Sequence, residues 1–272
     1  MKKIALSLAL AATLILSQPT GPAQAAGGGA ELPHIDWSFS GIFDKFDRAQ
    51  LKRGWLVYKD ICAGCHAMRL LRYRNLTEIG FSADQVKKIA AEFEVPAGPN
   101  EEGETANDDG EPFMRKALPS DAFVSPFPNT LAARAANNGS LPPDLSLMAK
   151  ARGGGANYLY GLMTGYKEEA PKGVKLGDGM AYNIYFPGNQ IAMIAPLSDE
   201  AVEYSDGTKP TLDQHALDVT AFLAWAAEPE EDEHAEFVAY IAGDDKELAS
   251  AAKAARDALI TLEAADVNFL QA

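Results

Sequence analysis

Cys62, Cys65 and His66 form a Cys-x-x-Cys-His sequence, the pattern of covalent c-type haem attachment. Thiols separated by two residues can both reach one edge of the macrocycle and add to its vinyl groups. The histidine that follows is then placed to bind the iron from the proximal face. Because the 272 residues contain no other cysteine, no other thiol competes for this role. We therefore expect one haem c, attached through Cys62 and Cys65 and ligated by His66.

Two other uses of such a cysteine pair fit the sequence less well. Redox-active thiol pairs of this spacing usually follow a strand in a βαβ unit, and no such pattern surrounds Cys62. A structural zinc site needs two more Cys or His ligands at short spacing. The remaining histidines, His34, His215 and His234, are scattered along the chain.

A second axial ligand decides whether the haem carries electrons or keeps an open binding position. A thioether favours ferrous iron and raises the reduction potential. Met193 stands in the irregular apolar stretch 191–196, where small neighbours would let the backbone approach a haem. Met180 stands in a similar glycine-rich loop. On chemistry alone Met193 is the stronger candidate and Met180 the alternative; the other methionines after the first 25 residues are Met68, Met114, Met148 and Met163.

Helical patterns surround the motif. Residues 48–60 carry apolar and small side chains at helical spacing and lead directly into Cys62. Thr211 is the predicted N-cap of a final helix that ends before Pro229. Close crossing of these two helices is expected, with Gly54 facing Ala221 or Ala224. Further helices are predicted at 81–93, 131–137 and 157–164. The expected fold is mainly α, a class I cytochrome c-like domain with long loops.

The chain divides into three parts. Residues 1–25 have a basic start, a short apolar run and an Ala-x-Ala site, which indicate a secretory signal peptide. Residues 26–229 form the predicted haem domain, with 34–46 expected as an irregular surface segment and 166–196 as a long ordered loop. Residues 94–112 are an acidic surface insertion with seven acidic residues and no basic ones.

The net charge is −14, and removal of Lys2 and Lys3 with the signal peptide makes it −16. Such a surface repels the phosphates of nucleic acids, so a nucleic-acid partner is not expected. It suits a basic protein partner, whose encounter rate it raises at low salt. Arg152, before three glycines, is a candidate partner for a haem propionate, because guanidinium pairs with carboxylate bidentately.

Between about residues 33 and 229 the sequence resembles the cytochrome c1 family, the haem subunit of the cytochrome bc1 complex (ubiquinol–cytochrome c oxidoreductase), in its bacterial form. The Pro142-Pro143 and Phe186-Pro187-Gly188 segments make the resemblance specific beyond the haem motif. The segments that carry it are 53–58, 135–146, 151–154, 185–193, 206–208 and 225–229.

By matching position, the resemblance implies that Cys62 and Cys65 form the thioethers, that His66 and Met193 ligate the iron, and that Arg152 lies near a propionate. It also implies a haem pocket that includes Tyr58, Asn137, Pro142, Pro143 and Tyr158.

The implied function is one-electron transfer on the periplasmic side of the bacterial inner membrane after export. Cytochrome b and the Rieske iron–sulfur protein would be partners in the complex, the latter reducing the haem. A basic cytochrome c would accept the electron near segment 94–112. This chain alone makes or breaks no substrate bond.

The sequence departs from the family after residue 229. Family members usually have a transmembrane helix there, but residues 230–272 contain no apolar run of the roughly 20 residues that span a bilayer. We expect an acidic tail with a short amphipathic helix, solvated or packed on a partner. Membrane association would then come from protein contacts within the complex or from a retained signal segment. The third alternative is a tail altered from its natural form.

Two other functions remain open from the sequence. A free periplasmic electron carrier on the same domain would need no anchor. A haem enzyme or gas sensor with an open distal site would apply if Met193 were not a ligand.

Overall fold

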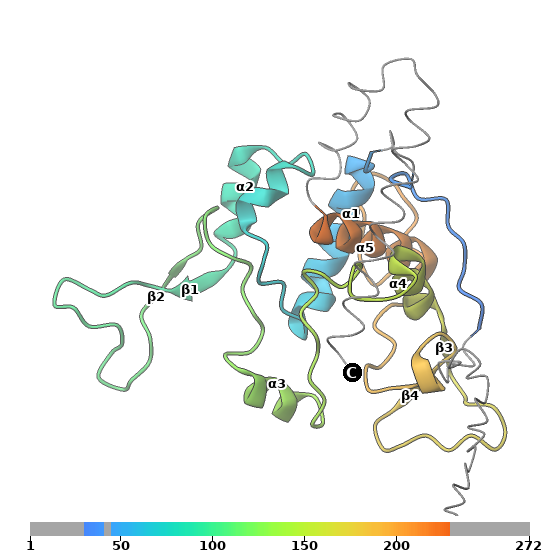
Figure 1. Ribbon diagram of the computed structural model, residues 1–272. Helices are drawn as coiled ribbons and strands as arrows, with labels where there is room; N and C mark the ends of the chain where they lie inside the picture. Colours follow the sequence, from blue (N-terminus) through green and yellow to red (C-terminus); the bar gives the residue numbers. More distant parts are fainter. Residues whose placement is uncertain (1–29, 41–44, 229–272) are drawn as a thin grey trace, which may run out of the picture.

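The computed structural model describes residues 30–40 and 45–228. It is largely helical with two small antiparallel sheets (Figure 1). The predicted signal peptide 1–25 and acidic tail 230–272 lie outside these residues. Within the described part, no helix is both long and apolar enough to span a bilayer. The elements in chain order are α1 (Arg48–Asp60), η1 (Cys62–Gly64), η2 (Tyr73–Thr77), α2 (Ala83–Ala90), β1 (Glu94–Pro96), β2 (Met114–Lys116), α3 (Thr130–Ala136), α4 (Gly155–Thr164), β3 (Tyr166–Lys167), β4 (Ala181–Asn183), η3 (Pro187–Asn189), β5 (Gln190–Ile191) and α5 (Leu212–Ala227), where η marks a 3-10 helix.

Side-chain caps begin three of the helices. Asp47 Oδ1 accepts the amide of Ala49 at the start of α1, and Ser82 and Gln85 form a reciprocal capping box at the start of α2. Thr211 accepts the amide of Gln214 at the start of α5. These side chains satisfy first-turn amides that have no partner within the helix. A helix lies near each of the five predicted positions, but α2 is shorter than the predicted 81–93, and α4 begins at Gly155 and not at 157.

Helices α1 and α5 cross at the centre of the domain (Figure 1). A Cβ at Gly54 would lie 2.1 Å from the carbonyl oxygen of Asp218 and 2.6 Å from Cβ of Phe222. The expected crossing at Gly54 is confirmed. The atoms of α5 nearest Gly54 belong to Asp218 and Phe222, and not to the expected Ala221 or Ala224.

An ion-pair network ties the two helices together. Arg53 Nε donates to the fully buried carboxylate of Asp218 at 3.0 Å, and Nη1 donates to Asp206 at 2.8 Å. The Tyr204 ring lies 5.8 Å from the guanidinium. Because a buried carboxylate is costly without a partner, Arg53 offsets the desolvation of Asp218.

Aromatic rings fill the space around the crossing. Trp55 and Tyr58 of α1 pack on Phe222 of α5 and on Phe123, with centroids 5.0–6.0 Å apart. Residues 34–46 were expected on the surface, and this was wrong for the aromatic side chains that the structure describes there: Trp37, Phe39 and Phe46 are buried. Trp37 Nε1 donates to Asn157 of α4 at 2.8 Å, which holds the segment against the domain.

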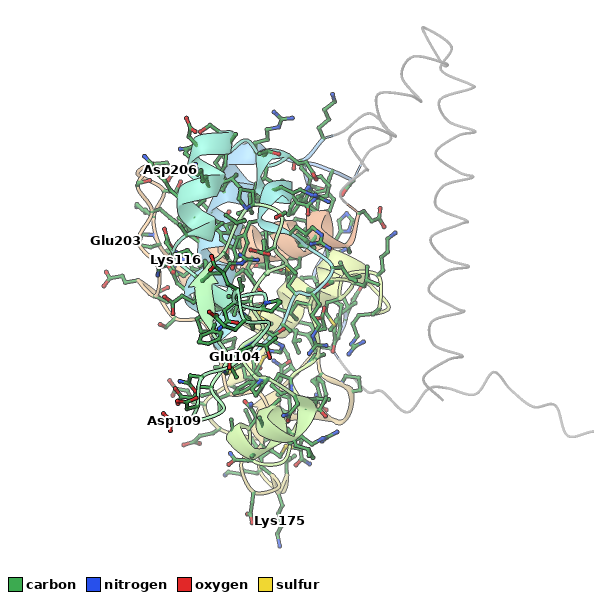
Figure 2. The ribbon with its side chains drawn as sticks, turned by 90° about the vertical axis from the view of Figure 1, so that its left-hand side faces the viewer. Glu104, Asp109, Lys116, Lys175, Glu203 and Asp206 are labelled. Atoms are coloured by element: carbon green, nitrogen blue, oxygen red, sulfur yellow. The ribbon has the colours of Figure 1, made fainter. Side chains whose placement is uncertain are left out.

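The acidic segment projects from the domain as a β-hairpin (Figure 1). Strand β1 pairs antiparallel with β2, Glu94 opposite Lys116, and the loop between them is largely exposed. Solvent exposure was predicted correctly, but the two short strands were missed. Figure 2 looks onto this side of the molecule, where Glu104 and Asp109 of the loop are labelled.

The loop of this hairpin contains the same turn twice. Asn100 Oδ1 accepts the amides of Glu102 and Glu104, and Asn107 Oδ1 accepts those of Asp109 and Glu111 in the same pattern. Each turn contains a glycine with positive φ. Each turn is thus held by hydrogen bonds to one asparagine side chain and not by a hydrophobic core.

Residues 166–196 contain a three-stranded sheet, β3-β4-β5, below α4. Its strands have two or three residues each, too few for an alternating pattern to be recognised in the sequence. The segment was expected to be an ordered loop, and it is ordered around this sheet.

Replacing Gly54 with Ala tests the helix crossing. We expect the free energy of unfolding to fall by about 1–3 kcal/mol, because the new methyl group overlaps α5. Denaturant unfolding of the purified protein measures it. Gly98→Ala is the control, since a Cβ there meets no atom within 4 Å. Equal unfolding midpoints for the two variants would contradict the close crossing.

The buried His215 predicts a pH effect on stability. Burial lowers its pKa below the ordinary value of a histidine, so the unfolded chain binds the proton more readily. Stability should therefore decline as the pH falls below about 6.5 and level off below the lowered folded pKa. His215→Asn, which retains a polar atom near the Tyr204 hydroxyl, should show a shallower decline in thermal melts from pH 7.5 to 5. If stability fell equally steeply with pH in the parent protein and in His215→Asn, His215 would not be the source of the pH effect.

Candidate functional site

The cysteine motif follows directly from the end of α1. The chain turns through η1, where the amides of Cys65 and His66 both donate to the carbonyl oxygen of Cys62, at 3.1 and 2.9 Å. This turn folds both thiols and the imidazole into one compact unit. Cys62 is half-buried and Cys65 exposed, and both are free thiols. Burial raises the pKa of Cys62 to about 12.

The His66 ring is oriented by a backbone carbonyl. Its Nδ1 lies 2.8 Å from the carbonyl oxygen of Pro143. Because a carbonyl only accepts, Nδ1 carries the proton and donates, which leaves the Nε2 lone pair available to a metal. Burial also lowers the pKa of His66, which favours the neutral imidazole that ligates metals.

The residues that follow His66 are held against segment 143–146. Side chains of Asp144 and Ser146 accept two backbone amides, and one more bond joins the two backbones. Sequence reasoning missed Asp144 and Ser146; the signal was the Asp-x-Ser pattern after the two prolines, which is typical of side chains that bind backbone. The bonds are Leu145 N to Ala67 O at 2.8 Å, Arg69 N to Asp144 Oδ2 at 3.1 Å and Leu70 N to Ser146 Oγ at 3.1 Å.

Tyr58 reaches this site from α1 with a buried hydroxyl. Its Oη has no hydrogen-bond partner among the described residues, and burial, then Cys62, raises its pKa. Native proteins rarely leave such a group unsatisfied. An orphaned donor beside Cys62 fits a polar ligand group bound at the motif.

Arg152 is half-buried just before α4. Its Nη1 donates to the carbonyl oxygen of Ala151 at 2.8 Å. Among the described residues, no carboxylate lies within ion-pair distance of its guanidinium. The ring of Tyr158 is near enough that the charge of Arg152 opposes the rise that burial causes in the pKa of Tyr158. These two predicted pocket residues are therefore neighbours, and Arg152 retains donors for an anionic group such as a propionate.

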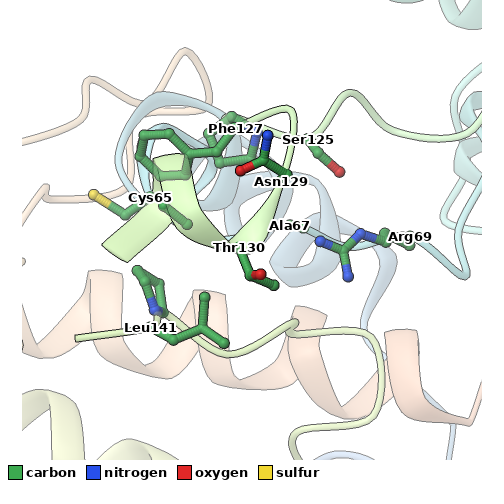
Figure 3. Close-up of a pocket in the computed structure, with 11 residues that line it drawn as sticks. Cys65, Ala67, Arg69, Ser125, Phe127, Asn129, Thr130 and Leu141 are labelled. Carbon is green, nitrogen blue, oxygen red and sulfur yellow. The ribbon is translucent and has the colours of Figure 1, made fainter. Parts of the chain in front are cut away.

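The other predicted pocket residues have more local roles in the structure. Asn137 caps α3 and donates from Nδ2 to the carbonyl oxygen of Ala133 at 2.7 Å. Pro142 lines a hollow of about 30 Å³ beside Cys65 (Figure 3). This is far below the roughly 300 Å³ of typical cofactor pockets. The Cys65 sulfur points away from Thr130 and Arg69 in that hollow (Figure 3).

The two candidate distal methionines differ in exposure. Met193 is half-buried in an irregular stretch after β5, whereas Met180 is 38% exposed. Tyr166 Oη donates to the carbonyl oxygen of Met193 at 3.1 Å. Sequence reasoning did not select Tyr166. The signal would have been the pairing of its strand, and a strand of two residues is too short to be recognised in the sequence. The structure gives no direct contact between Met193 and His66.

Comparison with known proteins shows which family this chain resembles. Residues 37–243 match the model of the Cytochrome C1 family. The chain is 47% identical over 227 residues to cytochrome c1 of Rhodospirillum rubrum, covering 78% of this chain and 81% of that protein. It is 47% identical over 209 residues to the mitochondrial cytochrome c1 haem protein of Saccharomyces cerevisiae, covering 77% and 65%. It is 43% identical over 227 residues to the mitochondrial cytochrome b-c1 complex catalytic subunit of Candida albicans, covering 82% and 76%.

Proposed function

Because the chain belongs to the cytochrome c1 family, we propose that it is the haem c subunit through which a cytochrome bc1 complex passes electrons. The bound haem supplies reversible one-electron chemistry. The residues of this chain hold that group, orient its ligands and keep water from them. The observation that carries the proposal is the Nδ1–carbonyl bond of His66 to Pro143, which presents Nε2 as a ligand beside two free thiols.

We propose the following residue roles. Cys62 and Cys65 attach the haem, His66 is the proximal ligand and Met193 the distal one. Arg152 binds a propionate, since its donors have no carboxylate partner among the described residues. The orphaned Tyr58 hydroxyl and the rings of Pro142 and Tyr158 complete the pocket with Asn137 and Pro143.

The fold proposed for this domain is that of a class I cytochrome c. The close crossing of the first and last helices, α1 and α5, supports it. The acidic hairpin of residues 94–116 is an insertion on that plan. Its exposed carboxylates supply a negative surface for a basic cytochrome c.

We infer the partners and the location of the protein from its family membership. Cytochrome b and a Rieske iron–sulfur protein are the proposed neighbours, and the Candida albicans relative is named as a subunit of the cytochrome b-c1 complex. The haem domain would lie on the periplasmic side of the bacterial inner membrane after removal of residues 1–25.

Replacing Met193 with Leu tests the distal ligand. We expect a sharply lower reduction potential and rapid carbon monoxide binding to the reduced protein, because the iron loses its thioether. Redox titration and flash photolysis measure the two effects. Met180→Leu is the matched control and should leave both unchanged. An unaltered potential in Met193→Leu would rule out this ligand and favour a haem with an open distal site.

Membership of the complex is tested by fractionating cells that express the full chain. We expect the c-type haem band of reduced-minus-oxidised spectra in detergent-extracted membranes, travelling with b-type haem through purification. A His66→Ala chain, defective in iron ligation, controls for contaminating cytochromes. The same band alone in the soluble periplasmic fraction would contradict the proposal and indicate a free electron carrier.

A further inference from the structure

The stretch that carries Met193 has few anchors. The chain enters it from Ile191, which is 7% exposed, and leaves it at Leu197, which is 5% exposed, while Ile194 between them is 75% exposed. Within the described part of the chain, one hydrogen bond reaches the backbone of residues 192–196. It is the bond from Tyr166 Oη to the carbonyl oxygen of Met193, at 3.1 Å.

Tyr166 is itself held by rigid parts of the fold. Its strand β3 pairs with β4, with Tyr166 opposite the fully buried Asn183. Asn183 Nδ2 donates to the carbonyl oxygen of Leu162 in α4 at 2.8 Å. Before Tyr166, a Cβ at Gly165 would lie 2.4 Å from the Tyr185 ring. The backbone on which Tyr166 stands is therefore closely packed.

We propose that Tyr166 is a positioning residue for the distal ligand. The Tyr166 hydroxyl fixes the backbone of residues 192–196 by donating to the carbonyl oxygen of Met193. The inference rests on the proposed function, in which Met193 binds the iron. Tyr166 touches neither the metal nor the sulfur in this role. It links α4 and the small sheet to a segment that otherwise has only its two buried ends.

The physical reason is the weakness of a thioether as a ligand. A neutral sulfur stays bound only if its segment loses little conformational freedom on binding, so an anchor already present in the fold favours the ligated state. One net hydrogen bond corresponds to roughly a three- to tenfold change in an equilibrium constant. Removing the hydroxyl while keeping the ring should therefore raise the fraction of protein with the methionine displaced by roughly this factor.

Tyr166→Phe in the full haem-loaded chain tests the inference. We expect a lower reduction potential, a weaker far-red absorption band of ferric methionine ligation, and carbon monoxide binding to the reduced protein roughly three- to tenfold faster. Tyr182→Phe is the matched control, because Tyr182 lies in the same sheet opposite Lys167 and its hydroxyl makes no hydrogen bond to the described residues. It should leave all three readouts unchanged.

Two results would overturn the inference. One is a Tyr166→Phe protein with an unchanged far-red band and unchanged carbon monoxide binding. The other is a fall in melting temperature alone, which would give Tyr166 a merely structural role. Met193→Leu, measured alongside, separates this from failure of the proposed function: if that variant also binds carbon monoxide no faster than the parent protein, Met193 is not the ligand and the proposed site is wrong.

Discussion

The absence of a side chain at Gly54 is the constraint on which this domain depends. It lets the backbone of α5 lie against α1, and the end of α1 is where the cysteine motif begins. Were the helices farther apart, the buried carboxylate of Asp218 would lose Arg53, and the aromatic rings between the helices would no longer fill the core. The position of Cys62 relative to the rest of the molecule is therefore set by a backbone contact about two turns upstream.

In the site, some residues are held by hydrogen bonds within the protein, and others have polar groups that lack a partner. His66 and the residues after it are tied by hydrogen bonds to segment 143–146, so the proximal side is shaped by the protein alone. In contrast, the Tyr58 hydroxyl has no hydrogen-bond partner among the described residues, and the Arg152 guanidinium, which donates to the carbonyl oxygen of Ala151, has no carboxylate partner among them. This is the pattern expected of a covalently bound group that brings its own carboxylates and whose pocket is completed when it is attached.

Sequence reasoning succeeded where chemistry is local. The haem motif, the caps of the helices and the glycine at the crossing are each visible within a few residues. It failed where the outcome depends on distant partners. The atoms of α5 nearest Gly54 belong to Asp218 and Phe222 and not to the small alanines, because the whole buried surface of α5 sets how the helix is rotated about its axis. Trp37 is buried by α4, which its own neighbours do not reveal, and the strands of β3-β4-β5 are too short to show a period.

In the hairpin loop with its two asparagine turns, the backbone shape does not depend on most of the acidic side chains. In each copy one asparagine side chain and two backbone hydrogen bonds hold the turn. Of the acidic side chains in the two turns, only that of Glu104 accepts a hydrogen bond within the described part of the chain, from Asn100 Nδ2. Evolution can therefore exchange residues such as Glu101 or Asp108 for other polar side chains without remodelling the loop. The electrostatic character of this surface can drift to match a changing redox partner while the haem domain behind it stays the same.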